Sequence, residues 1–135
     1  PDLDLQAIWI DEGIKNREVN NELLGIIKKL RKNYSAGVLT NLTYSRLALD
    51  EKINLYSHFD YAILSCKEHL MKPDPAFYQL SLRAASAKPE EAVFVDDKEK
   101  CTVGAEQVGM KSILYVYPDN RKLLENLKRF GVSII

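Results

Sequence analysis

Two short apolar runs of this chain stop abruptly at polar side chains, and this feature constrains the fold more than any other. Residues 92–95 are apolar and lead directly into the carboxylates of Asp96 and Asp97. Residues 36–39 lead in the same way into a threonine and an asparagine. Apolar runs of this length, bounded by polar groups, are typical of strands buried on both faces of a parallel sheet. Open α/β sheets bind their ligands at the carboxyl ends of such strands.

Segments with the character of strands and of helices alternate along the chain. Strands are expected over residues 36–39, 61–64, 92–95 and 112–116, with a short edge strand over residues 131–135. Helices are expected near residues 20–32, 45–50, 75–86, 101–108 and 119–130. This alternation predicts an α/β fold built on one doubly wound, Rossmann-like parallel sheet with helices on both faces.

Size and charge limit the class of protein. A chain of 135 residues suits one domain with one hydrophobic core. The formal net charge of zero gives no electrostatic reason to expect nucleic acid or an acidic membrane surface as a partner. No apolar run approaches the roughly 18 residues of a transmembrane helix. Because the first residues also lack the pattern of a secretory signal, we interpret the protein as cytoplasmic.

The acidic pair at the end of residues 92–95 is a candidate metal site. Two adjacent carboxylates repel each other, so holding them at a strand end is unfavourable unless a cation compensates. Mg²⁺ prefers oxygen ligands and keeps several waters, which makes Asp96 and Asp97 candidate ligands for it. In the alternative interpretation, Asp97 caps the following helix, and the pair alone leaves both interpretations open.

A hydroxyl and a cation elsewhere in the chain could complete a phosphate site. The hydroxyl of Thr40 and the backbone N–H of Asn41 can each donate a hydrogen bond to a phosphate oxygen. Lys72 precedes Pro73, which favours an extended backbone and a side chain that projects from a loop. The alternatives are a polar helix cap at Thr40 and an ordinary solvated lysine at position 72.

Taken in order, these segments resemble the haloacid dehalogenase-like superfamily of hydrolases over about residues 20–115. The matching segments are Val38-Leu39-Thr40-Asn41, Lys72-Pro73-Asp74-Pro75, Phe94-Val95-Asp96-Asp97 and residues 104–110. The resemblance implies that Thr40 and the backbone N–H of Asn41 bind phosphate, and that Thr40 and Lys72 act in catalysis. It also implies that Asp96 and Asp97 hold Mg²⁺. Cys101 stands where members of the superfamily often carry asparagine or aspartate, a departure that bears on the metal site.

The superfamily's first motif, a strand ending in Asp-x-Asp, is not intact in this chain. Asp2 and Asp4 have the spacing, but no strand precedes them. Residues 7–10 are apolar and end at Asp11, yet Gly13 stands where the second aspartate belongs. Asp11 is therefore at best a degenerate form of the nucleophile.

The competing interpretation, which we favour on spacing, is a helix that forms the tail of an absent cap domain. One face of this helix would consist of Leu5, Ile8, Trp9 and Glu12. Residues 1–19 would then be a remnant of the cap, or else a degenerate first strand, ahead of a core domain at residues 20–135. A core without its central strand exposes unpaired backbone groups. Residues 5–10, a neighbouring chain in a homodimer, or direct pairing of the flanking strands would have to fill the gap.

These features predict a HAD-like hydrolase whose parent protein is a Mg²⁺-dependent phosphatase of a small phosphorylated metabolite, working through an aspartyl-phosphate. Because the nucleophile motif is not intact, we expect this chain to be truncated and weakly active or inactive. The alternative is a non-catalytic binding or scaffold domain derived from such an enzyme. The order of the polar segments argues against a phosphoacceptor signalling domain, and the acidic pair argues against a carbon–halogen hydrolase. The interpretation requires positions 40, 72, 96 and 97 to meet at one edge of the sheet.

Overall fold

The computed structural model describes residues 5–11 and 21–134, and in them five strands form one sheet. The strands are β1 (Ala7–Ile10), β2 (Ser35–Thr40), β3 (Tyr61–Leu64), β4 (Ala92–Asp96) and β5 (Lys111–Leu114). The α-helices are α1 (Asn21–Leu30), α2 (Tyr44–Lys52), α3 (Ser65–Glu68), α4 (Pro75–Ala84), α5 (Glu99–Gln107) and α6 (Asn120–Arg129). The 3-10 turns η2 (Leu55–His58) and η3 (Pro89–Glu91) precede β3 and β4. No helix in the described part of the chain is both long and apolar enough to cross a bilayer.

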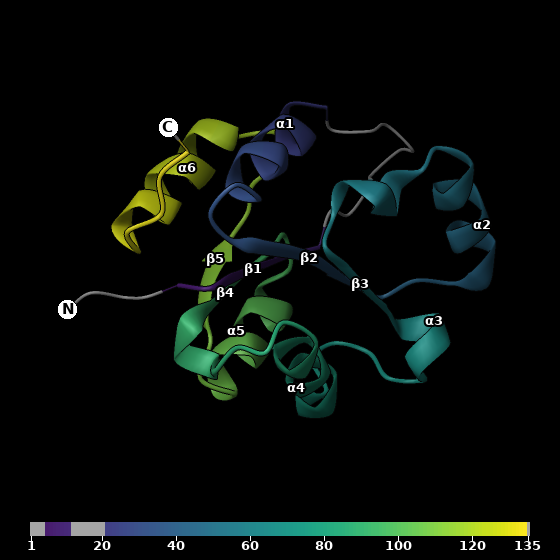
Figure 1. Ribbon diagram of the computed structural model, residues 1–135. Helices are drawn as coiled ribbons and strands as arrows, with labels where there is room; N and C mark the ends of the chain where they lie inside the picture. Colours follow the sequence, from purple (N-terminus) through teal and green to yellow (C-terminus); the bar gives the residue numbers. More distant parts are fainter. Residues whose placement is uncertain (1–4, 12–20, 135) are drawn as a thin grey trace.

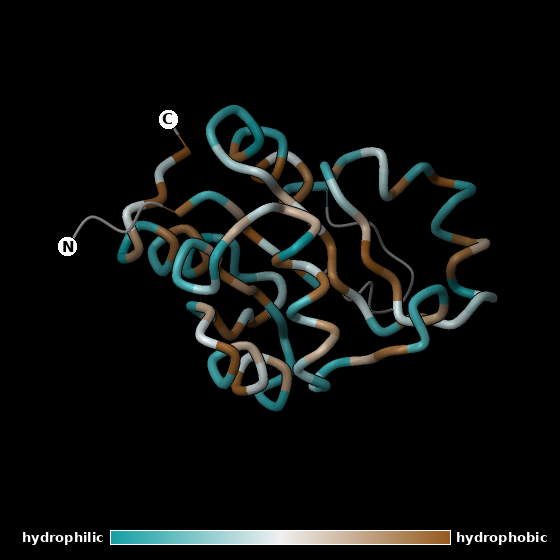
Figure 2. The backbone as a smooth tube through the Cα atoms, turned by 60° about the horizontal axis from the view of Figure 1, so that its bottom comes forward, coloured by the Kyte–Doolittle hydropathy of each residue, from teal (hydrophilic) through white to brown (hydrophobic). Residues whose placement is uncertain are grey.

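The sheet has the order β3-β2-β1-β4-β5, and every neighbouring pair is parallel. Helices α1 and α6 cover one face, and α4 and α5 cover the other (Figure 1). A separate hydrophobic cluster lies between the sheet and each pair of helices. In Figure 2 the brown, hydrophobic stretches lie mostly inside the molecule, and the teal, hydrophilic stretches lie mostly on its outer turns. The predicted α/β, Rossmann-like sheet with helices on both faces is confirmed.

The central strand of the sheet is β1, so the helix favoured for this segment from its spacing is wrong. β1 pairs in parallel with β2 on one side and with β4 on the other. Ile8 and Ile10 pack toward α1 and α6, while Ala7 and Trp9 pack toward α4 and α5. A helix would bury one stripe of these residues, whereas a central strand buries both faces and pairs its backbone on both sides.

The segment that fills the centre of the sheet was left open between three possibilities by the sequence. Of the three possibilities, residues 5–10 themselves supply the strand, so the sheet does not lack its central position. The alternative nucleophile pair at Asp2 and Asp4 lies outside the described residues, as do Glu12 and Gly13. The proposed division of the chain at residue 19 also falls in that undescribed part.

A glycine beside β1 makes room for the largest side chain of the core. Trp9, Gly37 and Tyr61 stand in register on β1, β2 and β3. The indole of Trp9 crosses over Gly37 and stacks on the ring of Tyr61, with 6.0 Å between ring centroids. A Cβ at position 37 would lie 2.4 Å from a ring carbon of Trp9, closer than any real contact. The packing of the Trp9 indole over Gly37 therefore holds β1 in its position beside β2.

The edge strand expected over residues 131–135 is absent from residues 131–134. Gly131 has a positive φ of 81°, and its N–H donates to the carbonyl of Lys128. The N–H of Val132 donates to the carbonyl of Leu127 at 3.0 Å. Both bonds end α6 and turn the chain back onto it, so these backbone groups are not available to extend the sheet.

Substituting the two glycines tests the position of β1. We expect Gly37→Ala to reduce the free energy of unfolding by about 1–3 kcal/mol, because Trp9 or the strand must shift. Gly25→Ala is the matched control, since Gly25 lies on an exposed helix position with nothing near a new Cβ. It should stabilise the protein by about 0.5–1 kcal/mol. Urea unfolding of both variants measures this, and a neutral Gly37→Ala would contradict the packing of Trp9 on β2.

Candidate active site

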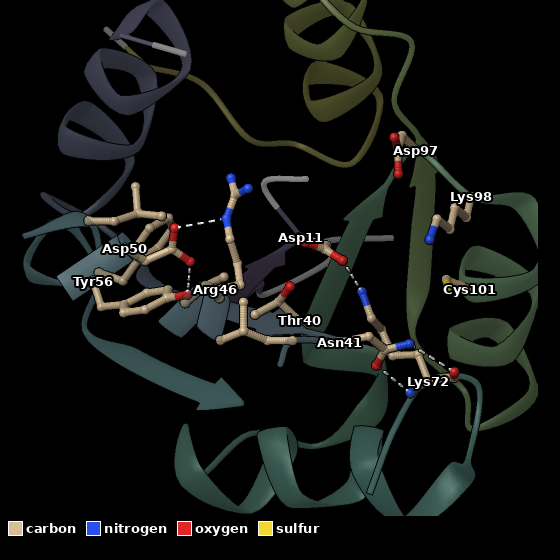
Figure 3. A pocket seen from close by; sticks show the side chains of 14 residues that line it. Asp11, Thr40, Asn41, Arg46, Asp50, Tyr56, Lys72, Asp97, Lys98 and Cys101 are labelled. Atoms are coloured by element: carbon tan, nitrogen blue, oxygen red, sulfur yellow. Dashed lines mark hydrogen bonds and ion pairs between the residues drawn. The ribbon is translucent and has the colours of Figure 1, made fainter. Parts of the chain in front are cut away.

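The carboxyl ends of β1, β2 and β4 surround a cavity of about 310 Å³ (Figure 3). Asp11 follows β1, Thr40 ends β2, and Lys72 enters from the loop ahead of α4. The polar side chains of the lining belong to Asp11, Thr40, Asn41, Arg46, Asp50, Tyr56, Lys72, Asp97 and Lys98, with Cys101 among them. The chain winds outward in opposite directions from β1 and β4, and ligands of open α/β sheets bind at such a switch point. The predicted convergence of positions 40, 72 and 97 is therefore present, and Asp96 joins it through Lys72.

Lys72 is buried between two carboxylates. Its ammonium nitrogen lies 2.6 Å from Oδ2 of Asp96 and also donates to Oδ2 of Asp11. The side chain is 1% exposed, so the alternative of a solvated surface lysine is wrong. Burial alone lowers the pKa of Lys72, but the charges of Asp11 and Asp96 outweigh it and raise the pKa above its ordinary value. Lys72 is therefore a cation at neutral pH.

Asn41 positions the main chain of Lys72. The side-chain amide of Asn41 donates to the Lys72 carbonyl at 3.1 Å, and its Oδ1 accepts from the Lys72 N–H at 2.8 Å. The neighbouring loop is tied to β3 as well, because the N–H of Leu42 donates to the hydroxyl of Ser65 at 2.7 Å. The resemblance gave Asn41 a role only through its backbone N–H. Its side chain has this second role, which the sequence pattern did not reveal.

Asp96 is more enclosed than a simple metal ligand at a strand end. It is completely buried, its Oδ2 accepts from Lys72, and its Oδ1 accepts from the N–H of Lys98 at 2.9 Å. Burial raises the pKa of this carboxyl, although the Lys72 ammonium opposes the shift, and the charge of Asp11 adds to it. Asp96 therefore holds Lys72 in place. That Asp96 also binds a metal ion stays a prediction.

The carboxylate of Asp11 lies beside the cavity, just after the carboxyl end of β1. The N–H of Asp11 donates to the carbonyl of Val95 at 2.9 Å, which fixes it across from β4. Its Oδ2 accepts from Lys72, whereas its Oδ1 is buried and has no hydrogen-bond partner among the described residues. A buried carboxylate oxygen without a partner is unfavourable unless a cation or a ligand reaches it.

The donor set suits Mg²⁺ through Asp11. In residues 5–11 and 21–134, no three His, Cys, Asp or Glu side chains gather closely enough to hold a metal ion. Mg²⁺ does not need such a group, because one or two carboxylates commonly hold it together with waters and substrate phosphate. The unpartnered Oδ1 of Asp11 and the carboxylate of Asp97 on the same cavity meet that requirement.

Cys101 stands on the first turns of α5 and contributes no charge to the site. It is 1% exposed, and the hydroxyl of Tyr78 donates to its backbone carbonyl at 2.6 Å. Burial raises the pKa of the thiol, and the nearby charge of Asp96 raises it further. The thiol therefore stays neutral at pH 7, unlike the aspartate that some members of the superfamily carry at this position.

Four polar residues of the cavity lining, Arg46, Asp50, Tyr56 and Lys98, lie outside the set predicted from the sequence. Arg46 and Asp50 of α2 form an ion pair, and Tyr56 of η2 donates to Asp50. The spacing of four between Arg46 and Asp50 was a usable signal, since such pairs meet on a helix face. Nothing in the sequence indicated that this face turns toward the site, or that Tyr56 joins it.

Replacing Lys72 should destabilise the protein and make its stability sensitive to pH. We expect Lys72→Met to cost about 3–5 kcal/mol at pH 7, because it leaves the buried carboxylate of Asp96 and the half-buried carboxylate of Asp11 without their cation. Without the ammonium, the pKa of Asp96 rises further above its unfolded value, so protonation favours the folded state. The deficit against wild type should therefore shrink as the pH falls from 7 toward 5.

The control is Lys100→Met, an exposed lysine of α5, which should change stability by less than about 0.5 kcal/mol. Chemical denaturation at several pH values measures both variants. If Lys72→Met alone fails to fold, the double variant with Asp96→Asn should recover part of the loss. A deficit that is constant with pH would contradict the burial of the carboxylates against Lys72.

Comparison with known proteins places the chain in a family. Residues 7–116 match the family model of haloacid dehalogenase-like hydrolases. The chain is 32% identical over 133 residues to bifunctional epoxide hydrolase 2 of Sus scrofa, covering 93% of this chain and 23% of that protein. It is 26% identical over 147 residues to glyceraldehyde 3-phosphate phosphatase of Pyrococcus furiosus, covering 99% of this chain and 60% of that protein. It thus spans less than two thirds of the length of either curated relative.

A solved structure agrees with the fold. An enzyme of the same family from Bacteroides thetaiotaomicron, in complex with magnesium and inorganic phosphate, superposes with a TM-score of 0.66. The match covers 73% of this chain and 54% of that one, at 22% sequence identity. The fold, the order of the polar segments and the match over residues 7–116 agree. The chain belongs to the haloacid dehalogenase-like hydrolases.

Proposed function

We propose that this chain is the core domain of a Mg²⁺-dependent phosphatase that hydrolyses a small phosphorylated metabolite through an aspartyl-phosphate on Asp11. One observation carries the proposal. The carboxylate of Asp11 stands at the end of the central strand, held on one oxygen by the buried Lys72. By resemblance, the nucleophile of the superfamily is the first aspartate after the first strand, and Asp11 follows β1 in the same way. The similarity to a phosphatase of Pyrococcus furiosus supports the same reaction class.

Asp11 and the predicted residues Thr40, Asn41 and Lys72 have distinct roles in this reaction. An oxygen of Asp11 attacks phosphorus, a P–O bond forms, and the bond to the leaving alcohol breaks. The hydroxyl of Thr40 and the backbone N–H of Asn41 would bind the phosphate oxygens. Lys72 lowers the repulsion between the carboxylate and the phosphate dianion, because its charge is already in place before the substrate arrives. Water then hydrolyses the acyl phosphate and releases phosphate.

Asp11 and Asp97 would hold Mg²⁺, and Asp96 is a further predicted ligand. The ion would supply positive charge close to the transferred phosphoryl group. The magnesium bound in the related Bacteroides enzyme supports this choice of ion. A cytoplasmic location and a homodimer stay predictions from the sequence.

The glycine at position 13 limits the rate in this proposal. By resemblance, the second aspartate of the motif donates a proton to the leaving group and later activates water. Gly13 has no side chain that could do either. Departure of a basic alkoxide is therefore slow, and so is hydrolysis of the acyl phosphate. The same residue is the specific reason to keep the alternative of a non-catalytic domain that binds phosphate without turning it over.

Replacing the nucleophile should abolish turnover. With Mg²⁺ and an aryl phosphate as substrate, we expect Asp11→Asn to lower kcat by at least about 10³-fold, because an amide cannot form the acyl phosphate. Glu106→Gln, an exposed acid on α5, is the matched control and should keep wild-type activity. Steady-state release of phosphate measures all three proteins. Turnover that survives Asp11→Asn would contradict the assignment of the nucleophile.

Turnover should depend steeply on the leaving group. An aryl phosphate releases a weakly basic phenolate that needs little proton donation, whereas an alkyl phosphate releases a strongly basic alkoxide. We expect kcat/KM for the aryl ester to exceed that of the alkyl ester by about 10²-fold or more, the usual contribution of a general acid. Equal rates for the two esters would mean that another group supplies the proton.

A further inference from the structure

Arg46 is a further positively charged residue of the cavity lining, besides Lys72 and Lys98. Arg46 stands in the first turn of α2, where its backbone N–H donates to the hydroxyl of Thr43, the helix cap, at 3.2 Å. The residue follows closely on the strand end that carries Thr40. Its guanidinium lies on the opposite side of Thr40 and Asp11 from the Lys72 ammonium (Figure 3).

The orientation of Arg46 is set by a buried carboxylate. Nε of Arg46 lies 3.1 Å from Oδ1 of Asp50, whose side chain is 5% exposed. The other oxygen of Asp50 accepts from the hydroxyl of Tyr56 at 2.5 Å. Burying a carboxylate is unfavourable unless its oxygens are hydrogen-bonded, and here each oxygen has a partner. Asp50 and Tyr56 therefore hold the guanidinium by its Nε edge.

The phenol of Tyr56 donates to Asp50 and stays protonated at neutral pH. Burial raises the pKa of its phenol, and the hydrogen bond to Asp50 and the charges of Asp50 and Asp11 raise it further. The phenol thus keeps the proton that it donates to Asp50. A rigid support of this kind reduces the conformational freedom that Arg46 would otherwise lose on binding a ligand.

We propose that Arg46 binds a second anionic group of the substrate, a carboxylate or a second phosphate, while the transferred phosphate sits between Asp11, Thr40 and Lys72. This inference rests on the proposed function and names its substrate class: small phosphate esters that carry another anion. The planar fork of arginine matches carboxylate and phosphate oxygens, and such charge-assisted bonds are strong in a partly buried site. A cavity of about 310 Å³ accommodates a molecule of a few carbon atoms with both groups. Arg46 is thus a specificity-determining residue, and Asp50 and Tyr56 are positioning residues.

Binding of matched ligands tests the proposal without requiring turnover. Phosphoglycolate and 2-hydroxyethyl phosphate have the same length and differ in one group, a carboxylate against an alcohol. Titration calorimetry with Mg²⁺ gives the ratio of their dissociation constants. We expect wild type to prefer phosphoglycolate by about tenfold or more, the range of a charge-assisted hydrogen bond. Ethylene glycol bisphosphate is the second arm, and it shows whether a phosphate serves better than a carboxylate.

Variants assign the preference to Arg46. Arg46→Met should bring the ratio close to one, and Arg46→Lys should restore part of it as a point charge without the fork. Tyr56→Phe should lower the ratio as well, although it touches no ligand, because it frees one oxygen of Asp50. Arg121→Met is the matched control: Arg121 is 92% exposed on α6, so its loss should leave the ratio unchanged.

Two results would overturn the inference, and they are distinguishable from failure of the proposed function. A wild-type protein that binds both ligands equally has no second anion site. A preference that is unchanged in Arg46→Met places that site elsewhere. In both cases the phosphate ester still binds, and the proposed function stands. If wild type binds neither ester nor inorganic phosphate, the proposed function fails, and the inference fails with it.

Discussion

The ammonium of Lys72, buried between the carboxylates of Asp11 and Asp96, is the interaction on which the rest of the site depends. An isolated charge of either sign is costly at this depth, so none of the three groups is stable there without the others. The requirement joins three segments that are far apart in the sequence: the ends of β1 and β4, and the loop ahead of α4. It also places the carboxylate of Asp11 beside the cavity, at the point where the strand order reverses.

The sequence predicted most of the sheet, because residues 36–39 and 92–95 are buried on both faces and read as continuous apolar runs. Residues 61–64 were also predicted as a strand, although β3 lies at the edge of the sheet and is only partly buried. The prediction was wrong for β1, because the secondary structure of this segment depends on the neighbouring strands and not on its own sequence pattern. The spacing of Leu5, Ile8 and Trp9 suits a helix, but Gly37 leaves space for the Trp9 indole only if the two strands lie side by side. The edge strand predicted at residues 131–135 is absent from residues 131–134 for a similar reason. The N–H groups of Gly131 and Val132 donate to carbonyls at the end of α6 and are not available to a sheet.

The candidate site was predictable where motifs carry it and unpredictable where packing does. Thr40, Lys72 and Asp97 meet on one cavity as their places at strand ends and in a loop suggested. The enclosure of Asp96 was not foreseen, because a sequence cannot tell an oxygen that faces a cavity from one that faces a lysine. The support of Arg46 by Asp50 and Tyr56 likewise depends on how α2 and η2 pack. Selectivity for the substrate would thus reside partly in the core domain.

Trapping the covalent intermediate tests the central claim most directly, namely that Asp11 is the nucleophile positioned by Lys72. Because Gly13 supplies no group to activate water, the acyl phosphate should persist long enough to be caught by acid quenching and located by peptide mass mapping. The account predicts a phosphoryl group on Asp11 after incubation with an aryl phosphate and Mg²⁺. Turnover with no acyl phosphate on Asp11, or with the phosphoryl group on Asp96 or Asp97, would contradict it.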